Sequence, residues 1–421
     1  MLELKFIREN ADIVRRAIAQ KHEHDTLDDI LRLDGRRREI IGEVEALKHE
    51  KNVASENIAR AKKAGENAQP AIAAMRAVSE KTQALDNDLR EIETAILQFQ
   101  LRIPNIPHPD VPVGDESANQ IVRSWGEEPS FTFKPAPHWE LGETHGIYDG
   151  VSGASVSGSG FFVLKGQGAR MQRALINFML DRHTANGYVE HRLPYLAGAA
   201  AMQGTGQLPK LAEEMYRIEA DDLYLIPTAE VPLTNLAAGS IIQAGHLPQR
   251  LVAYTPCFRR EAGAHGKDTR GMIRVHQFDK VELVKIVEPE RSYNELESLV
   301  ADAEAILQAL NLPYRVKVLA TGDLSFAAAK CYDLEVYAAG VDAWLEVSSC
   351  SNFVDFQARR MNLRVRPSGG GKPFFPHTLN GSALALPRTM IALWENGQTE
   401  KGTIRIPDVL VPYMEGKTEI A

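Results

Sequence analysis

Residues 257–283, CFRREAGAHGKDTRGMIRVHQFDKVEL, combine arginines, carboxylates and an aromatic ring within one short segment. The alternation of charged and apolar residues predicts a β-hairpin whose connection spans 262–271. Because side chains alternate between the two faces of a strand, one face of the second strand would carry Arg274, His276, Phe278, Lys280 and Glu282. On the first strand, Arg259 and Glu261 would share a face, with Phe258 on the other.

These residue types suit a ligand with several chemical parts. The forked donors of arginine match phosphate oxygens, an aromatic ring can stack on a base, and a carboxylate accepts hydrogen bonds from an amine or a hydroxyl. At about 3.3 Å per residue, Arg274, Phe278 and Glu282 follow one another in steps of roughly 13 Å. The hairpin therefore favours a compact nucleotide-like ligand over the alternative, a solvated amphipathic hairpin.

Two glycine-rich stretches do not add a phosphate loop. GAHGKD at 263–268 has the wrong glycine spacing for a Walker motif, and no Ser or Thr follows Lys267. SGSGFF at 157–162 lacks the third glycine of a dinucleotide fingerprint. We interpret both as ordinary turns.

Strands and helices alternate around the hairpin without regular βαβ spacing, which indicates an antiparallel α+β domain. We expect strands at 222–228, 250–258, 332–340 and 344–351. We expect helices at 169–187, which Gly187 would stop, and at 293–312.

The N-terminal region has a different pattern. Apolar residues recur in a 3-4 repeat from Ile30 to Ala61 and again from Ala71 to Phe99, on either side of a break at 65–70. This predicts two helices that pack antiparallel as a coiled-coil arm over about 27–102, each roughly 50 Å long. The proline-rich segment 102–114 would then be a linker.

The arm has two possible uses. Residues 36–63 hold eight basic and five acidic residues, a net of +3, whereas 76–102 hold four and five. The basic helix favours a polyanion, although a purely structural or dimerising coiled coil remains an alternative.

Length and composition set the limits. The 421 residues suggest two or more domains, and no run is apolar for long enough to span a membrane. The net charge of −8 excludes a generally basic protein but permits a basic patch. The three cysteines are too scattered for a disulfide framework or a structural zinc site, and we expect Cys257 and Cys350 to be buried and structural. The charged start MLELKFIREN is unlike a signal peptide, so we expect a cytoplasmic protein.

Several segments resemble class II aminoacyl-tRNA synthetases, and in detail the seryl-tRNA synthetase family. FRREAG…RGMIRVHQF resembles motif 2, LIPTAEVPLTN (225–235) the serine-binding strand, and LEVSSCSNFVDFQARR (345–360) the metal and ATP strand. TLNGSALALPRTMIALWENGQ (378–398) resembles motif 3, the helix at 169–187 with its continuation to Pro194 resembles motif 1, and LKFIREN with the arm resembles the tRNA-binding domain.

The resemblance implies an α+β protein with two domains. Residues 1–112 would form the tRNA-binding domain with its antiparallel helical arm, and residues 113–421 a class II catalytic domain on an antiparallel sheet flanked by helices. Only 421 − 388 = 33 residues follow Arg388, too few for the anticodon-binding domain that the threonine, proline, glycine and histidine enzymes usually carry there.

The resemblance also implies a site for ATP and Mg²⁺. Arg259 and Arg388 would be the catalytic residues, Arg259 on the α-phosphate and Arg388 stacked on adenine opposite Phe278. Glu261 would meet the adenine amine and Arg274 the γ-phosphate. The full ATP set is Arg259, Arg260, Glu261, Arg274, Val275, Phe278, Glu346, Val347, Ser348, Ser349 and Arg388. Glu346 and Ser349 would carry Mg²⁺, and no zinc is expected.

L-serine would lie beside the ATP. Thr228 and Glu230 would take its ammonium group, Glu282 and Ser382 its hydroxyl, and Arg259 its carboxylate. The full serine set is Thr228, Ala229, Glu230, Arg259, Glu282, Asn380 and Ser382.

By the same resemblance, the protein would be a serine–tRNA ligase that forms seryl-adenylate and transfers serine to the 3′-terminal adenosine of tRNA-Ser. It would act as a homodimer and would not bind a membrane. The arm would bind the long variable arm of the tRNA, and tRNA-Sec could also be charged. Candidate tRNA contacts are Lys48, Lys51, Arg60, Lys62 and Lys63.

Two other interpretations remain open at this point. One is a ligase that charges a carrier protein, which would be expected to lack the arm. The other is an inactive paralogue that binds RNA or a partner, which would be expected to lack residues such as Glu346.

Motif 3 departs from the family pattern at two positions. Pro387 is expected to start the helix, and Gly397 to stop it.

Overall fold

The computed structural model describes residues 1–262 and 270–421, so the glycine-rich stretch at 263–268 lies outside the described residues. The chain forms two compact units, Leu2–Pro104 and Asn105–Ala421. The functional division expected at 112/113 stays a prediction. Among the helices that the structure describes, none has both the length and the apolar character needed to cross a membrane.

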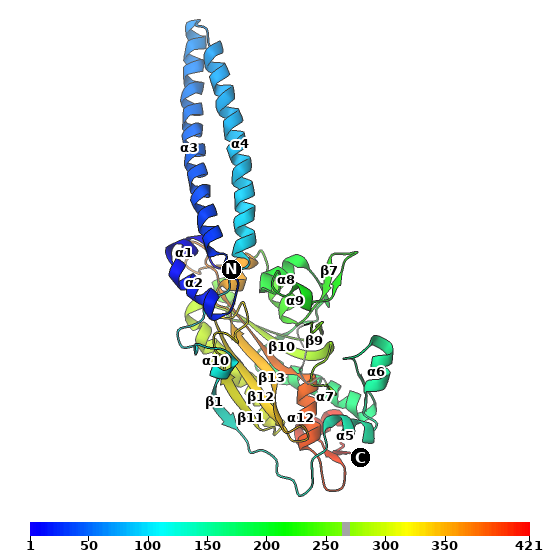
Figure 1. The fold of residues 1–421 in the computed structure, drawn as a ribbon. Coiled ribbons are helices and arrows are strands. Elements are labelled where there is room, and N and C mark those ends of the chain that lie inside the picture. Colours follow the sequence, from blue (N-terminus) through cyan, green and yellow to red (C-terminus); the bar gives the residue numbers. More distant parts are fainter. Residues whose placement is uncertain (263–269) are drawn as a thin grey trace. The chain divides into compact units, whose positions relative to one another are not determined.

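The first unit contains the predicted helical hairpin (Figure 1). Two short helices, α1 (Leu4–Glu9) and α2 (Ala11–Gln20), precede the long helices α3 (Leu27–Ala64) and α4 (Gln69–Gln100). Gly65 caps α3 in the left-handed conformation at φ 75°, and Pro70 lies in the first turn of α4. The break at 65–70 is therefore confirmed, because its glycine and proline occupy the positions that end one helix and start the next.

The seam of the arm follows the 3-4 repeat. Ile40, Val44 and Leu85 form a buried cluster onto which Leu47, Leu89 and Ile92 pack. The repeat from Ile30 to Ala61 also includes Arg37 and Lys51, and of all the repeat positions only Lys51 is exposed. Arg37 contacts Glu93 at 3.0 Å, and the Ser55 hydroxyl lies 3.3 Å from the Met75 sulfur. Both pairs have the same sum of residue numbers, as two antiparallel helices in one register require.

The second unit is built on an eight-stranded sheet (Figure 1). Its order is β1 (Gln120–Trp125), β11 (Tyr314–Val318), β12 (Lys330–Ala338), β13 (Ala343–Asn352), β15 (His377–Ala385), β10 (Gln277–Val287), β9 (Gln249–Phe258) and β4 (Val189–Glu190). Every neighbouring pair is antiparallel except β4 and β9. The prediction of an antiparallel α+β domain is confirmed.

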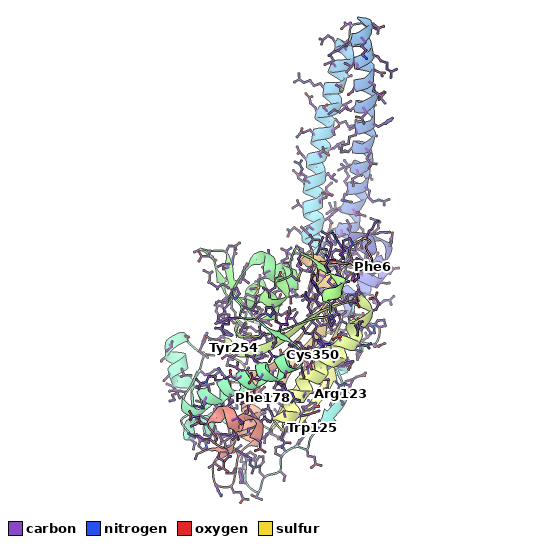
Figure 2. The ribbon with its side chains drawn as sticks, turned by 180° about the vertical axis from the view of Figure 1, so that it is seen from behind. Phe6, Arg123, Trp125, Phe178, Tyr254 and Cys350 are labelled. Carbon is purple, nitrogen blue, oxygen red and sulfur yellow. The ribbon has the colours of Figure 1, made fainter. Side chains whose placement is uncertain are left out.

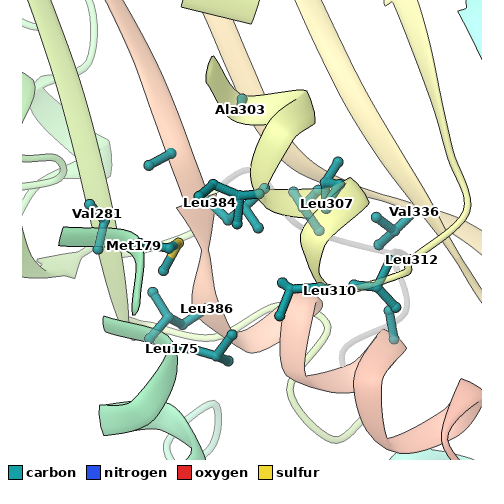
Figure 3. Packing of buried hydrophobic residues seen from close by; sticks show 14 of the residues in the cluster. Leu175, Met179, Val281, Ala303, Leu307, Leu310, Leu312, Val336, Leu384 and Leu386 are labelled. Carbon is teal, nitrogen blue, oxygen red and sulfur yellow. The ribbon is translucent and has the colours of Figure 1, made fainter. Parts of the chain in front are cut away.

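Helices α7 (Gly166–Ala185), α10 (Ser292–Ala309) and α12 (Leu386–Asn396) pack on this sheet. Figure 3 shows Leu175 and Met179 of α7 near Val281 and Leu386, and Leu307 of α10 near Leu384. Figure 2 shows the opposite side, with Phe178 on α7 and with Arg123 and Trp125 on the edge strand.

Both predicted helices end earlier than expected. Helix α7 stops at Ala185, and Gly187 follows it at φ 83°, as a stop signal should. Helix α10 ends at Ala309, not at residue 312, because Leu310 and Leu312 fill the core from an irregular segment.

The strand expected at 222–228 is much shorter. Strand β7 covers Leu223–Leu225 and lies outside the main sheet, between β5 (Leu196–Gly198) and β6 (Arg217–Ile218). The backbone leaves the strand before Pro227 and enters the short helix α9 (Glu230–Asn235). The segment expected to be a serine-binding strand is thus a strand, a turn and a helix.

The remaining elements are short. The helices are α5 (His138–Thr144), α6 (Gly150–Ser157), α8 (Ala199–Thr205) and α11 (Phe356–Arg360). Single 3-10 turns lie at Glu116–Ala118, Ala212–Glu214, Ala244–His246 and Pro289–Arg291, and a longer 3-10 helix covers Asp408–Met414. The strands are β2 (Tyr148–Asp149), β3 (Val163–Leu164), β8 (Ile241–Gln243), β14 (Arg364–Arg366), β16 (Ile404–Arg405) and β17 (Glu419–Ile420). SGSGFF forms a turn after α6, as expected.

Candidate active site

A cavity of about 610 Å³ opens in the sheet unit beside β10, β13 and β15. Its wall includes most of the residues predicted from the sequence: Thr228, Glu230, Arg259, Glu261, Arg274, Val275, Phe278, Glu346, Val347, Ser348, Ser349, Asn380, Ser382 and Arg388. Three of the candidates are absent from the wall. Ala229 is fully buried, Arg260 turns toward the Glu213 carbonyl, and Glu282 lies behind Asn380 and Ser382.

The predicted hairpin needs a correction at the end where the loop connects its two strands. Strand β9 ends at Phe258 and β10 begins at Gln277, so Arg259, Glu261 and Arg274 do not lie on paired strands. Glu261 has a left-handed backbone at φ 50°. The backbone N–H of His276 donates to Gly160 at 3.0 Å instead of to a strand partner. This part of the cavity wall is therefore formed by irregular backbone outside the sheet.

Two β-bulges set which side chains face the cavity. On β13, Ser348 pairs with Leu334 and Glu346 with Glu335, which leaves Val347 without a partner. On β15, Leu384 pairs with Val281 and Ser382 with Glu282, which leaves Ala383 without a partner. An extra residue reverses the alternation of side chains beyond it. Glu346 and Ser349, three residues apart, therefore both reach the cavity.

Glu282 is the centre of a buried polar cluster. Its side chain is fully buried, and Asn380 Nδ2 donates to it at 2.8 Å and Ser382 Oγ at 3.4 Å. Lys280 Nζ lies 2.6 Å from Glu282 Oε2, the oxygen that also accepts from Ser382, and donates to Thr228 Oγ1 at 2.9 Å. A buried carboxylate needs such partners, because an unpaired one would be very unfavourable.

Glu230 lies in the same cluster. Burial, together with the nearby charge of Glu282, raises the pKa of the Glu230 carboxyl to about 7. Gln357 Nε2 donates to it at 2.6 Å, which opposes that rise by favouring the charged form. The group is therefore poised to gain or lose a proton near neutral pH.

The arginines line the other end of the cavity. The Arg259 guanidinium lies 5.1 Å from the centre of the Phe278 ring, and its Nε donates to the Pro227 carbonyl at 3.4 Å. Arg274 forms an ion pair with Glu261. Two fixed positive groups beside an aromatic ring can hold phosphates next to a base.

Arg388 lies in the first turn of α12, opposite this group. Its Nε donates to the Ile273 carbonyl at 3.0 Å, and Nη1 donates to the Glu346 carbonyl at 2.9 Å. Pro387 occupies the first turn, so the expectation that it starts the helix is confirmed. Gly397 follows the helix, but at φ −83° it is not a left-handed cap. A side chain there would meet the Leu393 and Arg405 carbonyls at 2.6 and 2.9 Å, which explains the glycine.

Glu346 and Ser349 offer one carboxylate and one hydroxyl to the cavity. Next to them, burial and the charge of Glu346 raise the pKa of Asp333 well above its usual value. Hard oxygen donors such as these suit Mg²⁺, which usually takes one or two carboxylates and completes its shell with water and substrate phosphates. Within the described ranges, no group of three or more His, Cys, Asp and Glu side chains is arranged to hold a metal.

Among the cavity and cluster residues that the sequence-based list omitted are Lys280, Asp333 and Gln357. The strand alternation predicts Lys280 on the same face as Phe278 and Glu282, which would have been enough to include it in the site. Asp333 of β12 pairs with Ser349 of β13, so the pairing of these two strands places it beside a predicted site residue. Gln357 had no signal, because only the fold brings α11 to Glu230. All three cysteines are buried and free; Cys331 lines the cavity, with its sulfur 3.1 Å from Ser349 Oγ.

The five candidate tRNA contacts belong to the other unit. Lys48, Lys51, Arg60, Lys62 and Lys63 all lie on α3 and are exposed. Arg60 has a single weak ion pair, with Glu56 at 3.7 Å.

Comparison with known proteins identifies the class. Residues 214–397 match the model of the tRNA synthetase class II core domain (G, H, P, S and T), and residues 1–107 match that of the seryl-tRNA synthetase N-terminal domain. With the antiparallel sheet and the cavity described above, the chain is a class II aminoacyl-tRNA synthetase.

The relatives define the family within that class. A serine–tRNA ligase of Thermomicrobium roseum is 54% identical over 100% of this chain and 95% of its own length. The structure of seryl-tRNA synthetase from Pyrococcus horikoshii complexed with ATP has a TM-score of 0.96 at 38% identity, covering 100% of this chain and 99% of its own. A cytoplasmic serine–tRNA ligase from Naegleria fowleri in complex with AMP has a TM-score of 0.90 at 29% identity, covering 100% and 98%.

The chain therefore belongs to the seryl-tRNA synthetase family. Its activity is that of an ATP-dependent serine–tRNA ligase. Neither a carrier-protein ligase nor an inactive paralogue is favoured by these relatives.

Proposed function

We propose that this chain activates L-serine with ATP in the 610 Å³ cavity and transfers the serine to the 3′-terminal adenosine of tRNA-Ser. The observation that carries the proposal is the joining of two sets of groups in one cavity. The buried polar cluster around Glu282 lies at one end of the cavity. Phe278, Arg259, Arg274 and Arg388 line the other end.

Adenine would stack between Phe278 and Arg388, with its amine at Glu261. The γ-phosphate would bind Arg274, which pairs with Glu261 in this structure. ATP binding would therefore separate this ion pair, because Glu261 would then contact the adenine amine and Arg274 the γ-phosphate. Arg260, Val275, Val347 and Ser348 would contribute further contacts.

The serine carboxylate would attack the α-phosphorus and displace pyrophosphate to form seryl-adenylate, with Arg259 holding both reacting groups. Such phosphoryl transfer depends mainly on positioning and on charge stabilisation, so no protein nucleophile is required. Glu346 and Ser349 would hold Mg²⁺, which when bound neutralises developing negative charge on the phosphates. Arg388 would stay in place because it donates to two backbone carbonyls from different segments of the wall, Ile273 and Glu346.

Serine selection follows from the polar cluster. The serine ammonium would bind at Thr228, Ala229 and Glu230, and its hydroxyl at Glu282 and Ser382, with Asn380 beside them. Alanine or glycine would leave these buried groups without a hydrogen-bond partner. Threonine has to be excluded by size, which is worth only about 1–3 kcal/mol per methylene.

The arm would bind tRNA. Lys48, Lys51, Arg60, Lys62 and Lys63 would contact the phosphates of its long variable arm, and tRNA-Sec would be a second substrate. Helix α7, which resembles motif 1, would form the interface of a homodimer. A cytoplasmic location and the division into domains at 112/113 belong to the same proposal.

The test is ATP–pyrophosphate exchange with purified protein, Mg²⁺ and each amino acid in turn, without tRNA. Exchange with serine alone is expected. Folded protein that shows no exchange with serine contradicts the proposed site, and transfer is then measured by tRNA-Ser charging with and without the arm.

A further inference from the structure

The side chains of His138 and Glu395 form a buried pair that none of the assignments above uses. His138 is the first residue of α5, and Glu395 lies in the last turn of α12. Both are completely inaccessible to solvent, and His138 Nδ1 lies 2.8 Å from Glu395 Oε1. A buried acid and imidazole require a structural or functional explanation.

Glu395 accepts four hydrogen bonds. The backbone N–H and the Nδ1 of His138 both reach Oε1 at 2.8 Å, while the N–H groups of Gly340 and Val341 reach Oε2 at 2.8 and 3.0 Å. These donors use the acceptor capacity of an ionised carboxylate. The Nδ1 of His138 is therefore a donor, and the opposite ring nitrogen is free to accept.

That nitrogen accepts from the segment that leaves the motif 2 loop. The N–H of Met272 donates to His138 Nε2 at 3.0 Å. Gly271 lies against the ring at φ 66°, where a Cβ atom would be 2.1 Å from Nε2. Arg270 adds a contact, with its guanidinium 5.1 Å from the centre of the Trp139 ring. The first residues of α5 thus hold residues 270–272.

The held segment continues directly into the cavity. Met272, Ile273 and Arg274 line it, and the Ile273 carbonyl accepts the hydrogen bond from Arg388. Glu395 lies on the same helix as Arg388. Through Gly340 and Val341 it also fixes the turn that leads into β13, the strand of Glu346.

We propose that His138 and Glu395 are positioning residues for the nucleotide end of the cavity. They set the place of residues 270–274, and through them the guanidinium groups of Arg274 and Arg388. This inference rests on the proposed function, because it assigns the pair to the ATP side of that same site. A merely structural role would only hold α5 against α12.

Two substitutions of His138 separate these roles. Asparagine places its amide nitrogen where Nδ1 is, so His138→Asn keeps the donor to Glu395 but loses the acceptor for Met272. Glutamine places its amide oxygen near Nε2, so His138→Gln keeps the acceptor and loses the donor. In pyrophosphate exchange we expect His138→Asn to raise the KM for ATP about tenfold, and His138→Gln to raise it less than about threefold. The KM for serine should stay within about twofold in both.

A second pair of variants leaves His138 and Glu395 intact. Gly271→Ala pushes residues 270–272 away from the ring. Gly146→Ala is the matched control, because Gly146 has nearly the same φ, 63°, and open space at the position of a new Cβ. We expect the KM for ATP to be about tenfold higher in Gly271→Ala than in Gly146→Ala. This comparison decides the matter if the His138 variants fail to fold.

The outcomes are distinct from those that test the proposed function. Absence of serine-dependent exchange in the parent chain overturns the proposed function itself. With an active parent, equal ATP constants for His138→Asn and His138→Gln, or an equal rise in the KM for serine, overturn the positioning role. Equal ATP constants for the two glycine variants overturn it as well.

Discussion

Lys280 and Glu282 form a buried ion pair on the cavity side of β10, with Lys280 Nζ 2.6 Å from Glu282 Oε2. The same lysine donates to Thr228 at 2.9 Å. It thus connects the group proposed for the serine hydroxyl with one proposed for the serine ammonium. Lys280 lines the cavity and Glu282 lies behind its wall, so the pair holds two opposite charges beside the proposed serine site.

Replacing Lys280 by methionine should impair serine binding. Removing one partner of a buried pair costs about 3–5 kcal/mol because it leaves the other charge unpaired. We expect kcat/KM for serine in pyrophosphate exchange to fall about 100-fold, close to 2.7 kcal/mol. Lys285→Met is the matched control, because Lys285 is an equally buried lysine of β10 that pairs with Glu295 of α10.

Both lysine variants should be less stable than the parent. Only Lys280→Met should change the KM for serine, since α10 packs against the opposite face of the sheet. A comparable rise in the KM for serine with Lys285→Met would show that general loosening of β10, and not the pair itself, governs serine binding.

Serine binding should strengthen as the pH rises toward neutrality. The pKa of Glu230 is about 7, so the carboxyl is largely protonated at pH 5.5 and largely charged at pH 8. Because only the charged form attracts the serine ammonium, the KM for serine should fall roughly 10–30-fold over this interval. Glu230→Gln should bind serine weakly with a flat profile; a parent profile that is equally flat contradicts the role of Glu230.

The same group should make stability depend on pH. The pKa of Glu230 rises from 4.5 to about 7 on folding, so the folded chain binds more protons in this window. Stability contributed by the protonated group is complete below pH 4.5 and is lost as the pH rises through 7. Relative to the parent, Glu230→Gln should therefore gain up to about 3 kcal/mol between pH 4.5 and 8.

Denaturant unfolding of the two chains at matched pH values measures this difference. The comparison cancels the other titrating groups, because they are present in both chains. A gain that is independent of pH would mean that Glu230 stays charged in the folded protein.

Removal of divalent cations should abolish pyrophosphate exchange, and Mg²⁺ should restore it. Glu346→Gln should raise the half-saturating Mg²⁺ concentration about 10–100-fold, because it removes the only charge that Glu346 and Ser349 together offer. Glu304→Gln is the control, since Glu304 is a paired glutamate of α10 that contacts Arg123 at 2.8 Å. Exchange that survives chelation, or the same Mg²⁺ dependence in both variants, contradicts the metal assignment.

Neutralising the basic residues of α3 should affect transfer and not activation. A variant with glutamine at 48, 51, 60, 62 and 63 should keep pyrophosphate exchange within about twofold, while the KM for tRNA-Ser rises about tenfold or more. The dependence of this KM on salt should also become weaker. Glutamine at Arg76, Lys81 and Arg90 of α4 serves as the control, and an equal effect there would remove the preference for α3.

The periodic parts of the fold could be predicted from the sequence. The 3-4 repeat located α3, α4 and the break at Gly65 because the seam of two paired helices repeats in sequence. The predicted bounds of strands β9, β12 and β13 agree with the structure within a few residues, since each strand is long and contains several apolar residues. Alternation along β10 correctly brought Phe278, Lys280 and Glu282 to one side of the sheet.

The errors occurred where tertiary contacts override local pattern. Residues 273–276 alternate like a strand, yet Met272 and His276 bond to His138 and Gly160 and keep the segment out of the sheet. The strand at 222–228 ends early because its backbone turns into α9. Gln357 and His138 could not be assigned from sequence, because Glu230 and Met272, which they contact at the site, lie more than a hundred residues away from them.

The bulges at Val347 and Ala383 also have a consequence for how this gene can change. Deleting Val347 would remove only a small apolar residue, but it would turn Ser349 and the residues after it to the opposite face of β13. Such a loss of one codon would turn the Ser349 side chain away from the cavity, although Ser349 itself is unchanged. Along these two strands, insertions and deletions should therefore be rarer among active descendants than substitutions of the same bulged residues.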